Sequence, residues 1–315
     1  MNVLVTGANG FVGQILCPTL ERAGLKVVRA VRMSTRYKEI AVGEVDGETS
    51  WSSVLDAGID SVVHLAARVP LIEKETEAAD SYHQVNTSGT IRLARECAAT
   101  GVRRFVFIST VKVLGEGCDK SLRFDDPVVP VDAYAVSKWA AEQSLWQISA
   151  ETGMEVVILR PPLVYGPGVG GNFLRLLQMA DRRIPLPLGA VHNRRSLIYV
   201  GNLVDVIRLC LTHPDAAGKT FMVSDDEDVS TAELIRRIAS ALGHGSFLLP
   251  VPVAWIRRIG DLLGKRSAID RLTGSLVVDS TPVQEELGWL PPYSMRAGMA
   301  LTAQWYRQYK SEMSA

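Results

Sequence analysis

Near its amino terminus the chain reads Asn2-Val-Leu-Val-Thr6-Gly7-Ala8-Asn9-Gly10-Phe11-Val12-Gly13. Residues 3–6 are aliphatic or β-branched, which is typical of a buried parallel strand. Apolar residues then recur at helical spacing, and Gly24 ends the helix that we predict for residues 11–23. Glycines between a strand and a helix permit a tight turn and let backbone amides approach a pyrophosphate. This stretch therefore predicts a dinucleotide-binding turn.

Strands and helices continue to alternate along the first half of the chain. Further strands are predicted at residues 26–31, 61–65, 104–109 and 155–160, and helices at residues 86–100 and 133–152. Such alternation gives right-handed crossovers and a parallel sheet with helices on both faces. We expect an α/β protein with a Rossmann-like, doubly wound parallel sheet in residues 1–165, which the chain rejoins around residues 196–223.

The second half has a different texture. Prolines and glycines are frequent after Arg160, as in segments that carry binding loops. Residues 203–212 are predicted to be helical, and so is a segment that Ser230 caps, with Glu233 three residues on. A strand at residues 219–223 is predicted to return to the main sheet. Residues 166–195 and 224–315 are expected to form a smaller, mostly helical substrate domain.

Composition and charge exclude several classes of protein. The 315 residues contain 34 Lys and Arg and 34 Asp and Glu, a balance that argues against nucleic acid as a partner. Four widely spaced cysteines and five histidines show no metal-ligand spacing, so we expect no metal site. No apolar run reaches the roughly 18–20 residues of a membrane span. We therefore expect a soluble, cytoplasmic protein without a membrane partner, in which helical tryptophans such as Trp139 and Trp255 pack in cores or at an interface.

The end of the second predicted strand bears on the choice of cofactor. Sites that prefer NAD place a carboxylate there, on the ribose hydroxyl. Here the strand ends Arg29-Ala-Val-Arg32, and no acidic residue follows before Glu39. An arginine can instead pair with a 2′-phosphate. The pattern favours NADP(H) and leaves NAD(H) possible, the alternative being that Arg32 is a solvated strand end.

A tyrosine and a lysine four residues apart suggest proton-transfer chemistry. Tyr134-Ala-Val-Ser-Lys138 places both side chains on one helix face, where the ammonium favours the phenolate. The tyrosine can then exchange a proton with a substrate oxygen. Tyr306 and Lys310 repeat the spacing, and there we expect only a solvated helix face.

Together these motifs resemble the extended short-chain dehydrogenases/reductases of the NAD-dependent epimerase/dehydratase family. The matching residues are Gly7-x-x-Gly10-x-x-Gly13, His64-Leu-Ala-Ala67, Val85-Asn86, Ser109-Thr110, Tyr134-x-x-x-Lys138 and Arg160-Pro-Pro-x-x-Tyr165-Gly-Pro167, and the likeness extends to about Pro292. Residues 109–116, 160–168 and 193–199 are most similar to bacterial 4-reductases of UDP-4-keto-6-deoxy-N-acetylhexosamines in O-antigen and surface-polysaccharide synthesis.

The resemblance implies a role for each matching residue. Tyr134 would donate or accept the proton, Lys138 would hold the nicotinamide ribose, Thr110 would bond the sugar oxygen, and Asn86 would support a proton-relay water. For Thr110 and Asn86 a strand-end hydroxyl and a helix cap are the alternatives. Cofactor contacts are implied at Gly7, Asn9, Gly10, Phe11, Val12, Gly13, Arg32, Glu44, Val45, Leu65, Ala66, Ala67, Ser109, Tyr134, Lys138 and Pro161. Substrate contacts are implied at Thr110, Lys112, Tyr134, Asn172, Leu186, Pro187, Arg195 and Arg271.

Three functions follow as hypotheses. The first is an NADP(H)-dependent reductase that converts a UDP-linked 4-keto-6-deoxy-N-acetylhexosamine into UDP-N-acetylquinovosamine or UDP-N-acetylfucosamine. The second is a UDP-sugar 4-epimerase with tightly bound NAD, and the third a non-catalytic dinucleotide sensor. By analogy with the family we also expect a homodimer formed through the helices at residues 86–100 and 134–152.

Overall fold

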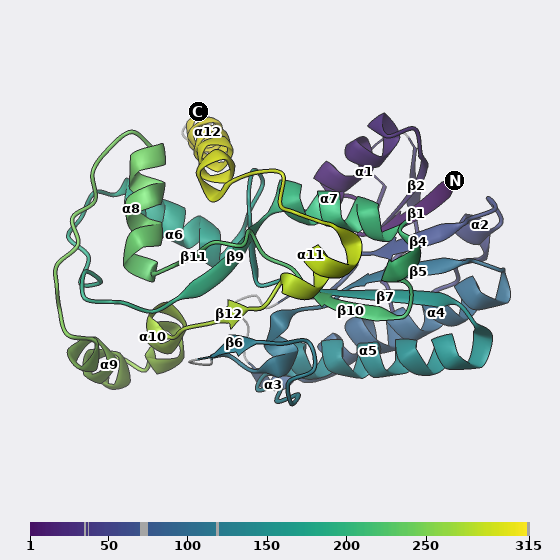
Figure 1. The fold of residues 1–315 in the computed structure, drawn as a ribbon, viewed down its shortest axis with the longest axis horizontal. Helices are drawn as coiled ribbons and strands as arrows, with labels where there is room; N and C mark the ends of the chain where they lie inside the picture. Colours follow the sequence, from purple (N-terminus) through teal and green to yellow (C-terminus); the bar gives the residue numbers. More distant parts are fainter. Residues whose placement is uncertain (35, 37, 70–74, 118–119, 314–315) are drawn as a thin grey trace.

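A seven-stranded parallel sheet forms the larger part of the protein (Figure 1). The computed structural model describes residues 1–34, 36, 38–69, 75–117 and 120–313. The strand order is β10-β7-β5-β4-β1-β2-β3, and every pairing is parallel. The strands are β1 (Asn2–Thr6), β2 (Lys26–Val31), β3 (Glu39–Ala41), β4 (Ser61–His64), β5 (Arg104–Ile108), β7 (Glu155–Arg160) and β10 (Lys219–Met222). The order reverses direction between β1 and β4, which confirms the doubly wound, Rossmann-like sheet.

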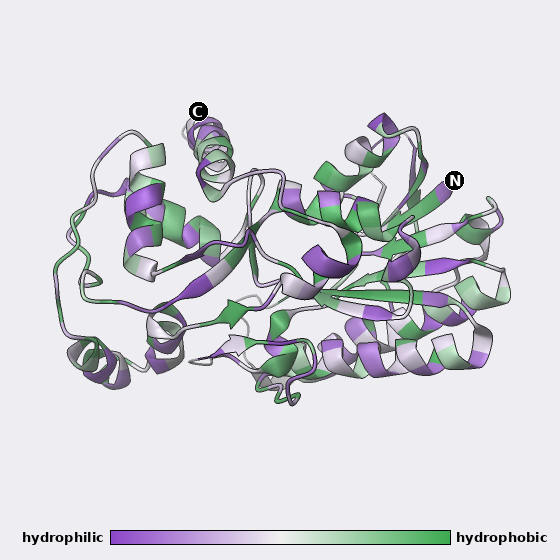
Figure 2. Ribbon diagram, in the orientation of Figure 1, coloured by the Kyte–Doolittle hydropathy of each residue, from purple (hydrophilic) through white to green (hydrophobic). Residues whose placement is uncertain are grey.

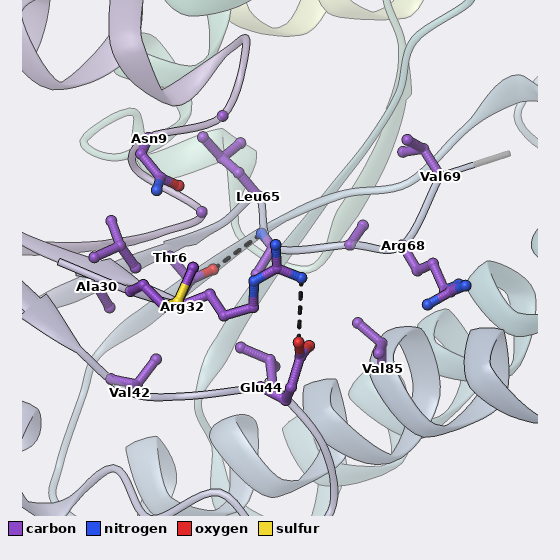
Figure 3. A pocket seen from close by; sticks show the side chains of 17 residues that line it. Thr6, Asn9, Ala30, Arg32, Val42, Glu44, Leu65, Arg68, Val69 and Val85 are labelled. Carbon is purple, nitrogen blue, oxygen red and sulfur yellow. Dashed lines mark hydrogen bonds and ion pairs between the residues drawn. The ribbon is translucent and has the colours of Figure 1, made fainter. Parts of the chain in front are cut away.

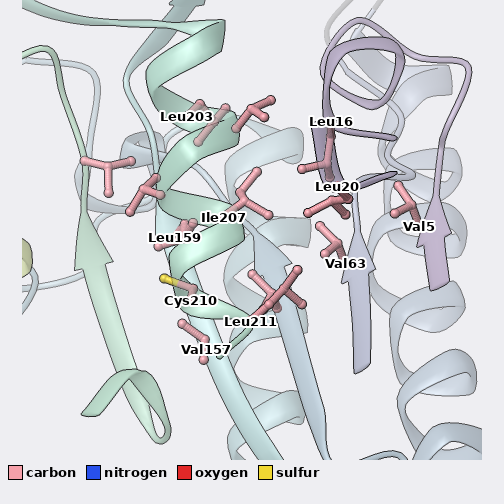
Figure 4. Packing of buried hydrophobic residues seen from close by; sticks show 14 of the residues in the cluster. Val5, Leu16, Leu20, Val63, Val157, Leu159, Leu203, Ile207, Cys210 and Leu211 are labelled. Carbon is pink, nitrogen blue, oxygen red and sulfur yellow. The ribbon is translucent and has the colours of Figure 1, made fainter. Parts of the chain in front are cut away.

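Helices cover both faces of this sheet because successive strand residues point to opposite sides. On one face α1 (Gly13–Arg22) and α7 (Val200–Cys210) pack Leu16, Leu20 and Ile207 against Val5 and Val63 (Figure 4). On the other face lie α4 (Gly89–Ala99) and α5 (Ala133–Thr152). Two dry cores of this kind hold the carboxyl ends of the strands in fixed positions.

The rest of the chain forms a second layer of structure beside the sheet. A three-stranded sheet has the order β11-β9-β8, and β12 pairs with β6. Figure 1 shows α6, α8, α9 and α10 at the end of the molecule away from β1. The remaining elements are β6 (Ser121–Leu122), β8 (Leu163–Tyr165), β9 (Arg195–Tyr199), β11 (Asp228–Val229), β12 (Val277–Val278), α2 (Ser52–Leu55), α3 (Glu75–Tyr82), α6 (Gly171–Asp181), α8 (Thr231–Ala241), α9 (Val253–Leu262), α10 (Arg266–Thr273), α11 (Thr281–Leu287) and α12 (Met295–Met313).

Most predicted elements occur within a residue or two of their expected limits. The predicted return strand exists as β10, which pairs with β7, and the Ser230 hydroxyl accepts a hydrogen bond from the Glu233 amide at the start of α8. Three details were wrong. Helix α1 begins at Gly13 because Phe11 and Val12 belong to the glycine turn, a π-helical segment (His83–Ser88) precedes α4, and the short strand β3 was not foreseen. The two-domain division stays a prediction.

Two further expectations concern helices. Within the described ranges, no helix is both long and apolar enough to cross a membrane. Tyr306 and Lys310 in α12 were expected to form a solvated helix face, and this expectation is wrong for Tyr306 only, because Lys310 is exposed. Tyr306 is buried in the core beside the three-stranded sheet, and the Lys310 Nζ lies 2.6 Å from the Asp181 Oδ2.

Candidate active site

The turn between β1 and α1 accepts only glycine at two of its positions. Gly7 has a φ of +64°, and a Cβ there would lie 2.9 Å from the backbone nitrogen of Ala66. A Cβ on Gly13 would lie 2.5 Å from the Gly7 carbonyl oxygen. The turn is closed by a 2.9 Å hydrogen bond from the Gly10 amide to that same carbonyl. The close approach of β1, the turn and the loop after β4 forms a cradle of the kind that a pyrophosphate requires.

A pocket of about 510 Å³ opens at the carboxyl ends of β1, β2 and β4 (Figure 3). Of the residues implied in cofactor binding, Gly7, Asn9, Gly10, Arg32, Glu44, Val45, Leu65, Ala66 and Ala67 line it. The pocket is also lined by residues that the cofactor contacts implied by the resemblance did not include: Thr6, Ala30, Val31, Met33, Val42, Arg68, Val69 and Val85. Phe11 and Val12 instead pack into the neighbouring hydrophobic core, and Pro161 is buried.

An acidic side chain does lie beside the end of β2, although it does not belong to that strand. Glu44, from the segment after β3, lies with its carboxylate 3.1 Å from the Arg32 guanidinium (Figure 3). The family resemblance implied a cofactor contact at Glu44, but the sequence of the second strand could not show that Glu44 lies against Arg32, because Glu44 comes from a later loop. Both side chains are about two-thirds exposed, at 64% and 65%. Such an exposed pair contributes at most about 1 kcal/mol, so either partner is free to exchange the other for a ligand.

Tyr134, Thr110 and Lys138 form one cluster. Thr110 follows β5, and Tyr134 lies in the first turn of α5, where it is hydrogen-bonded to the Thr110 side chain. Burial, with a smaller contribution from the Asp132 charge, raises the pKa of Tyr134 above its ordinary value, and the bond to Thr110 offsets part of that rise. Lys138 is buried one helical turn further on, with its Nζ 4.0 Å from the Phe107 ring centre. Burial lowers the Lys138 pKa to about 7, although the charge of Glu142 opposes this.

Asn86 connects this cluster to the pocket. Its Oδ1 accepts from the Arg68 amide at 2.8 Å, and its Nδ2 donates to the Arg68 carbonyl and the Ser137 hydroxyl, both at 3.0 Å. Asn86 lies inside the π-helical segment, so it is not the helix cap that was the alternative reading. It fixes the loop after β4, which lines the pocket, against α5 next to Lys138.

Lys112 is engaged rather than free at the surface. Its Nζ donates to the Asp132 Oδ2 at 2.8 Å and to the Glu116 Oε1 at 2.9 Å. Burial alone would lower its pKa, but the hydrogen bonds and charges of these two carboxylates outweigh that effect and raise it. Asp132 also caps α5, because its Oδ1 accepts from the Ala135 amide at 2.7 Å. Lys112 therefore braces the helix end that carries Tyr134.

Of the other residues implied in substrate binding, some are buried within the protein and some are exposed. Arg195 is half-buried and donates to the carbonyl oxygens of Arg271 at 2.6 Å and Gly274 at 3.1 Å, and burial lowers its pKa. Arg194, by contrast, points outward to Asp228. Asn172, Pro187 and the Arg271 side chain are exposed, whereas Leu186 is buried in the core with its backbone bonded to Phe247 and Leu249. Their roles stay predictions.

Comparison with known proteins fits the fold and this arrangement. Residues 3–224 match the family model described as "NAD dependent epimerase/dehydratase family". The chain belongs to that family. It is 42% identical to a UDP-glucose 4-epimerase of Vibrio cholerae over 98% of this chain and 96% of that one. It is 28% identical to an N-acetyl-alpha-D-glucosaminyl-diphospho-ditrans,octacis-undecaprenol 4-epimerase of Escherichia coli O157:H7, over 96% and 95% of the two chains. Among solved structures, MoeE5 in complex with UDP-glucose and NAD has a TM-score of 0.79 and 26% identity, with 98% and 100% of the chains covered.

A buried ion pair that involves Glu142 escaped the sequence analysis. Ser109 donates to the Glu142 carboxylate, and the Arg160 Nη2 lies 2.6 Å from the Glu142 Oε2. Ser109 therefore bonds Glu142 in the interior and does not line the pocket. The signal was present in the sequence, because Glu142 continues the four-residue spacing of Tyr134 and Lys138 along α5.

The described residues contain no group of three or more His, Cys, Asp or Glu side chains that could hold a metal ion. His64, at the end of β4, is buried between two hydroxyls. Its Nδ1 lies 2.7 Å from the Thr6 Oγ1, and its Nε2 lies 3.0 Å from the Thr90 Oγ1. The histidine is therefore packed and hydrogen-bonded.

Proposed function

We propose that the chain is an oxidoreductase that acts at C4 of a UDP-linked sugar. The observation that carries this proposal is the cluster of Tyr134, Thr110 and the buried Lys138, which Asn86 connects to the pocket through its bonds to Arg68 and Ser137. The glycine cradle and the pocket fit a dinucleotide, held by residues such as Gly7, Gly10 and Ala66. The nicotinamide, when bound, supplies the hydride chemistry.

Within that class, the first candidate is the reduction of a 4-keto sugar, in which Tyr134 would donate the proton. Because its pKa is raised, Tyr134 is a neutral phenol at neutral pH and can donate a proton to the sugar oxygen. Thr110 would orient the same oxygen, and Lys138 would hold the ribose. The substrate proposed is a UDP-linked 4-keto-6-deoxy-N-acetylhexosamine, giving UDP-N-acetylquinovosamine or UDP-N-acetylfucosamine. Arg32 on the pocket wall supports NADPH as the reductant, because its guanidinium matches a 2′-phosphate.

A second candidate is a UDP-sugar 4-epimerase with bound NAD. Two observations favour it. The Vibrio cholerae relative with this activity in its name is 42% identical over nearly the whole chain. In addition, the Glu44 carboxylate stands at the end of β2, where it could accept a hydrogen bond from a ribose hydroxyl. An epimerase begins by taking a proton from the sugar hydroxyl, so Tyr134 would then have to start as the phenolate.

Two reaction mixtures separate the two candidates. The first contains the protein, NADPH and a UDP-4-keto-6-deoxy-N-acetylhexosamine generated in place by a dehydratase, and it is followed by nicotinamide absorbance and product NMR. The second contains the protein, NAD and UDP-glucose, without added reductant. Stoichiometric loss of NADPH with a new reduced sugar nucleotide is expected. Absence of NADPH loss, together with interconversion of UDP-glucose and UDP-galactose without added reductant, would establish the epimerase instead.

The substitution Tyr134→Phe tests the catalytic assignment itself. Removal of the phenolic proton is expected to lower kcat by about 10²–10⁴-fold, the usual contribution of a general acid. Dinucleotide binding, followed by fluorescence titration, should stay within about twofold of the parent, because the hydroxyl faces the Thr110 side of the cluster. Full activity in Tyr134→Phe would remove Tyr134 from the mechanism. Wild-type protein that binds dinucleotide but turns over neither substrate would indicate the sensor.

A further inference from the structure

Helix α9 turns an apolar face toward solvent. Trp255, Ile259 and Leu262 are spaced by four and three residues, so they lie on one side of the helix. The exposed fractions are 69% for Trp255, 53% for Ile259 and 83% for Leu262, and Leu263 at the end of the helix is also exposed. Of the two alternatives expected for Trp255, a core or an interface, its exposure excludes the core. Exposed apolar side chains grouped in this way mark an interaction surface.

The opposite side of the same helix is used for packing. Ile256 and Gly260 are buried, and a Cβ on Gly260 would lie 2.1 Å from the Ile269 Cδ1 of α10. The helix is thus held against α10 by one face, and the outward apolar face is a separate feature. Figure 1 shows α9 at the extremity of the molecule, far from the seven-stranded sheet, and Figure 2 shows apolar and polar residues side by side on it.

Charge around this face is positive, although the whole chain is neutral. Residues 253–273 contain five basic and two acidic residues. Both acidic residues form ion pairs, because Asp270 lies 3.2 Å from Arg257 and Asp261 lies 3.0 Å from Arg266. Arg258 and Lys265 are exposed and have no ion-pair partner among the described residues. Arg258 lies one helical turn before Leu262 on α9, and Lys265 follows the end of that helix, so both are close in the chain to the exposed face formed by Trp255, Ile259, Leu262 and Leu263.

We propose that this α9 face docks on the surface of an anionic phospholipid bilayer. Aromatic and aliphatic side chains beside unpaired cations are the pattern of a helix that lies in the membrane interface, where acyl chains receive the apolar face and lipid phosphates receive the cations. A second copy of the chain fits less well, because a two-fold contact at this face would bring the same unpaired cations together. This proposal revises the expectation of no membrane partner, and it does not rest on the proposed function.

Vesicle co-sedimentation of the full chain tests the proposal. Binding to vesicles of phosphatidylglycerol and phosphatidylethanolamine is expected to exceed binding to phosphatidylcholine vesicles by at least about tenfold, since two cations face the surface. High salt should reduce it, because surface charges are screened. The emission of Trp255 should shift to shorter wavelength on binding, and the shift should be missing in Trp255→Phe. Equal binding to both kinds of vesicle, or none to either, would overturn the proposal.

Matched variants locate the contact. Leu262→Ser and the pair Arg258→Glu with Lys265→Glu should each lower binding to the anionic vesicles by about tenfold or more. Leu290→Ser, at a similarly exposed leucine elsewhere, and Arg175→Glu, at an exposed arginine on α6, should bind as the parent does. Unaltered binding in the α9 variants would refute this location. A dimer in sedimentation velocity that Leu262→Ser dissociates, without vesicle binding, would assign the face to a second copy.

Discussion

His64 and Lys138 are both buried, and the Lys138 charge adds to the desolvation that lowers the pKa of His64 to about 3. Neutral His64 is held by Thr6 and Thr90, so it stabilises the strand end without titrating near neutrality. Lys138 differs, because its pKa of about 7 places its charge change in the working range. Without ligand, the protein carries a lysine that is only partly charged at neutral pH.

Lys138 should make stability depend on pH in a defined direction. The pKa of Lys138 is about 7 in the folded protein, whereas in the unfolded chain it has its ordinary value of 10.5. Between these two pH values the unfolded chain holds a proton that the folded protein lacks. Stability should therefore rise as pH increases through this window, and stay flat with respect to Lys138 below it. Urea unfolding of the parent and of Lys138→Met across the window measures the difference. Parallel curves for the two proteins would show that Lys138 titrates normally.

Arg32 and Glu44 should set cofactor preference in opposite directions. Arg32→Asp is expected to raise the KM for NADPH by about tenfold or more and to change that for NADH little, because a bidentate phosphate contact is worth roughly 1.5–3 kcal/mol. Glu44→Gln should lower the KM for NADPH, since a carboxylate repels the 2′-phosphate. Steady-state kinetics with both cofactors provide the measurement. Equal effects of Arg32→Asp on NADPH and NADH would contradict the assignment.

Helix α5 carries Tyr134, Lys138 and Glu142 on one face, each about one turn from the next. Tyr134 lies at its start, Lys138 follows, and Glu142 holds Arg160 and Ser109 in the interior. The Asp132 cap and the Lys112 ion pair fix the first turn, and Gly153 ends the helix in the left-handed conformation. The position of Tyr134 thus depends on charged contacts at both the surface and the core side of one helix.

Loss of Glu142 should destabilise the whole protein. Glu142→Ala leaves the buried Arg160 without its counter-charge, and breaking a buried pair in this way costs about 3–5 kcal/mol. The double variant Glu142→Leu with Arg160→Met should recover much of that loss. Asp125→Ala, which breaks the exposed pair with Arg123, is the control and should cost under about 1 kcal/mol. Guanidinium unfolding measures the free energy of unfolding of all three variants. A loss in Glu142→Ala as small as that in the control would contradict the prediction.

At the scale of the molecule, a buried carboxylate joins the large sheet to the smaller one. Asp225 follows β10 and accepts hydrogen bonds from the Tyr165 hydroxyl, the Tyr199 amide and the Asn202 side chain, all at 2.7–2.8 Å. Burial raises the pKa of Asp225, and these three donors oppose that rise. Tyr165, Tyr199 and Asn202 come from β8, β9 and α7, so one side chain ties the three-stranded sheet to the end of β10 in the seven-stranded sheet.

Asp225→Ala is therefore expected to lower the free energy of unfolding by about 3 kcal/mol or more, because it leaves several buried donors without an acceptor. The exposed Asp215→Ala should change it by less than about 0.5 kcal/mol. Thermal and urea unfolding give the comparison. A near-neutral Asp225→Ala would mean that water replaces the lost carboxylate.

The sequence alone determined the parallel sheet, the glycine turn and the tyrosine-lysine pair, because each depends on local spacing. Periodicity specifies which residues face inward, and the requirement for glycine at position 13 comes from the nearby Gly7 and Ala8, which a Cβ there would meet. Tertiary structure decided what depends on residues distant in the chain. Glu44 meets Arg32 from a later loop, Glu142 meets Arg160 across the interior, and Arg195 rather than Arg194 turns inward. The outward face of α9 was equally hidden, because an amphipathic pattern shows that a helix has an apolar side but not whether the protein covers it.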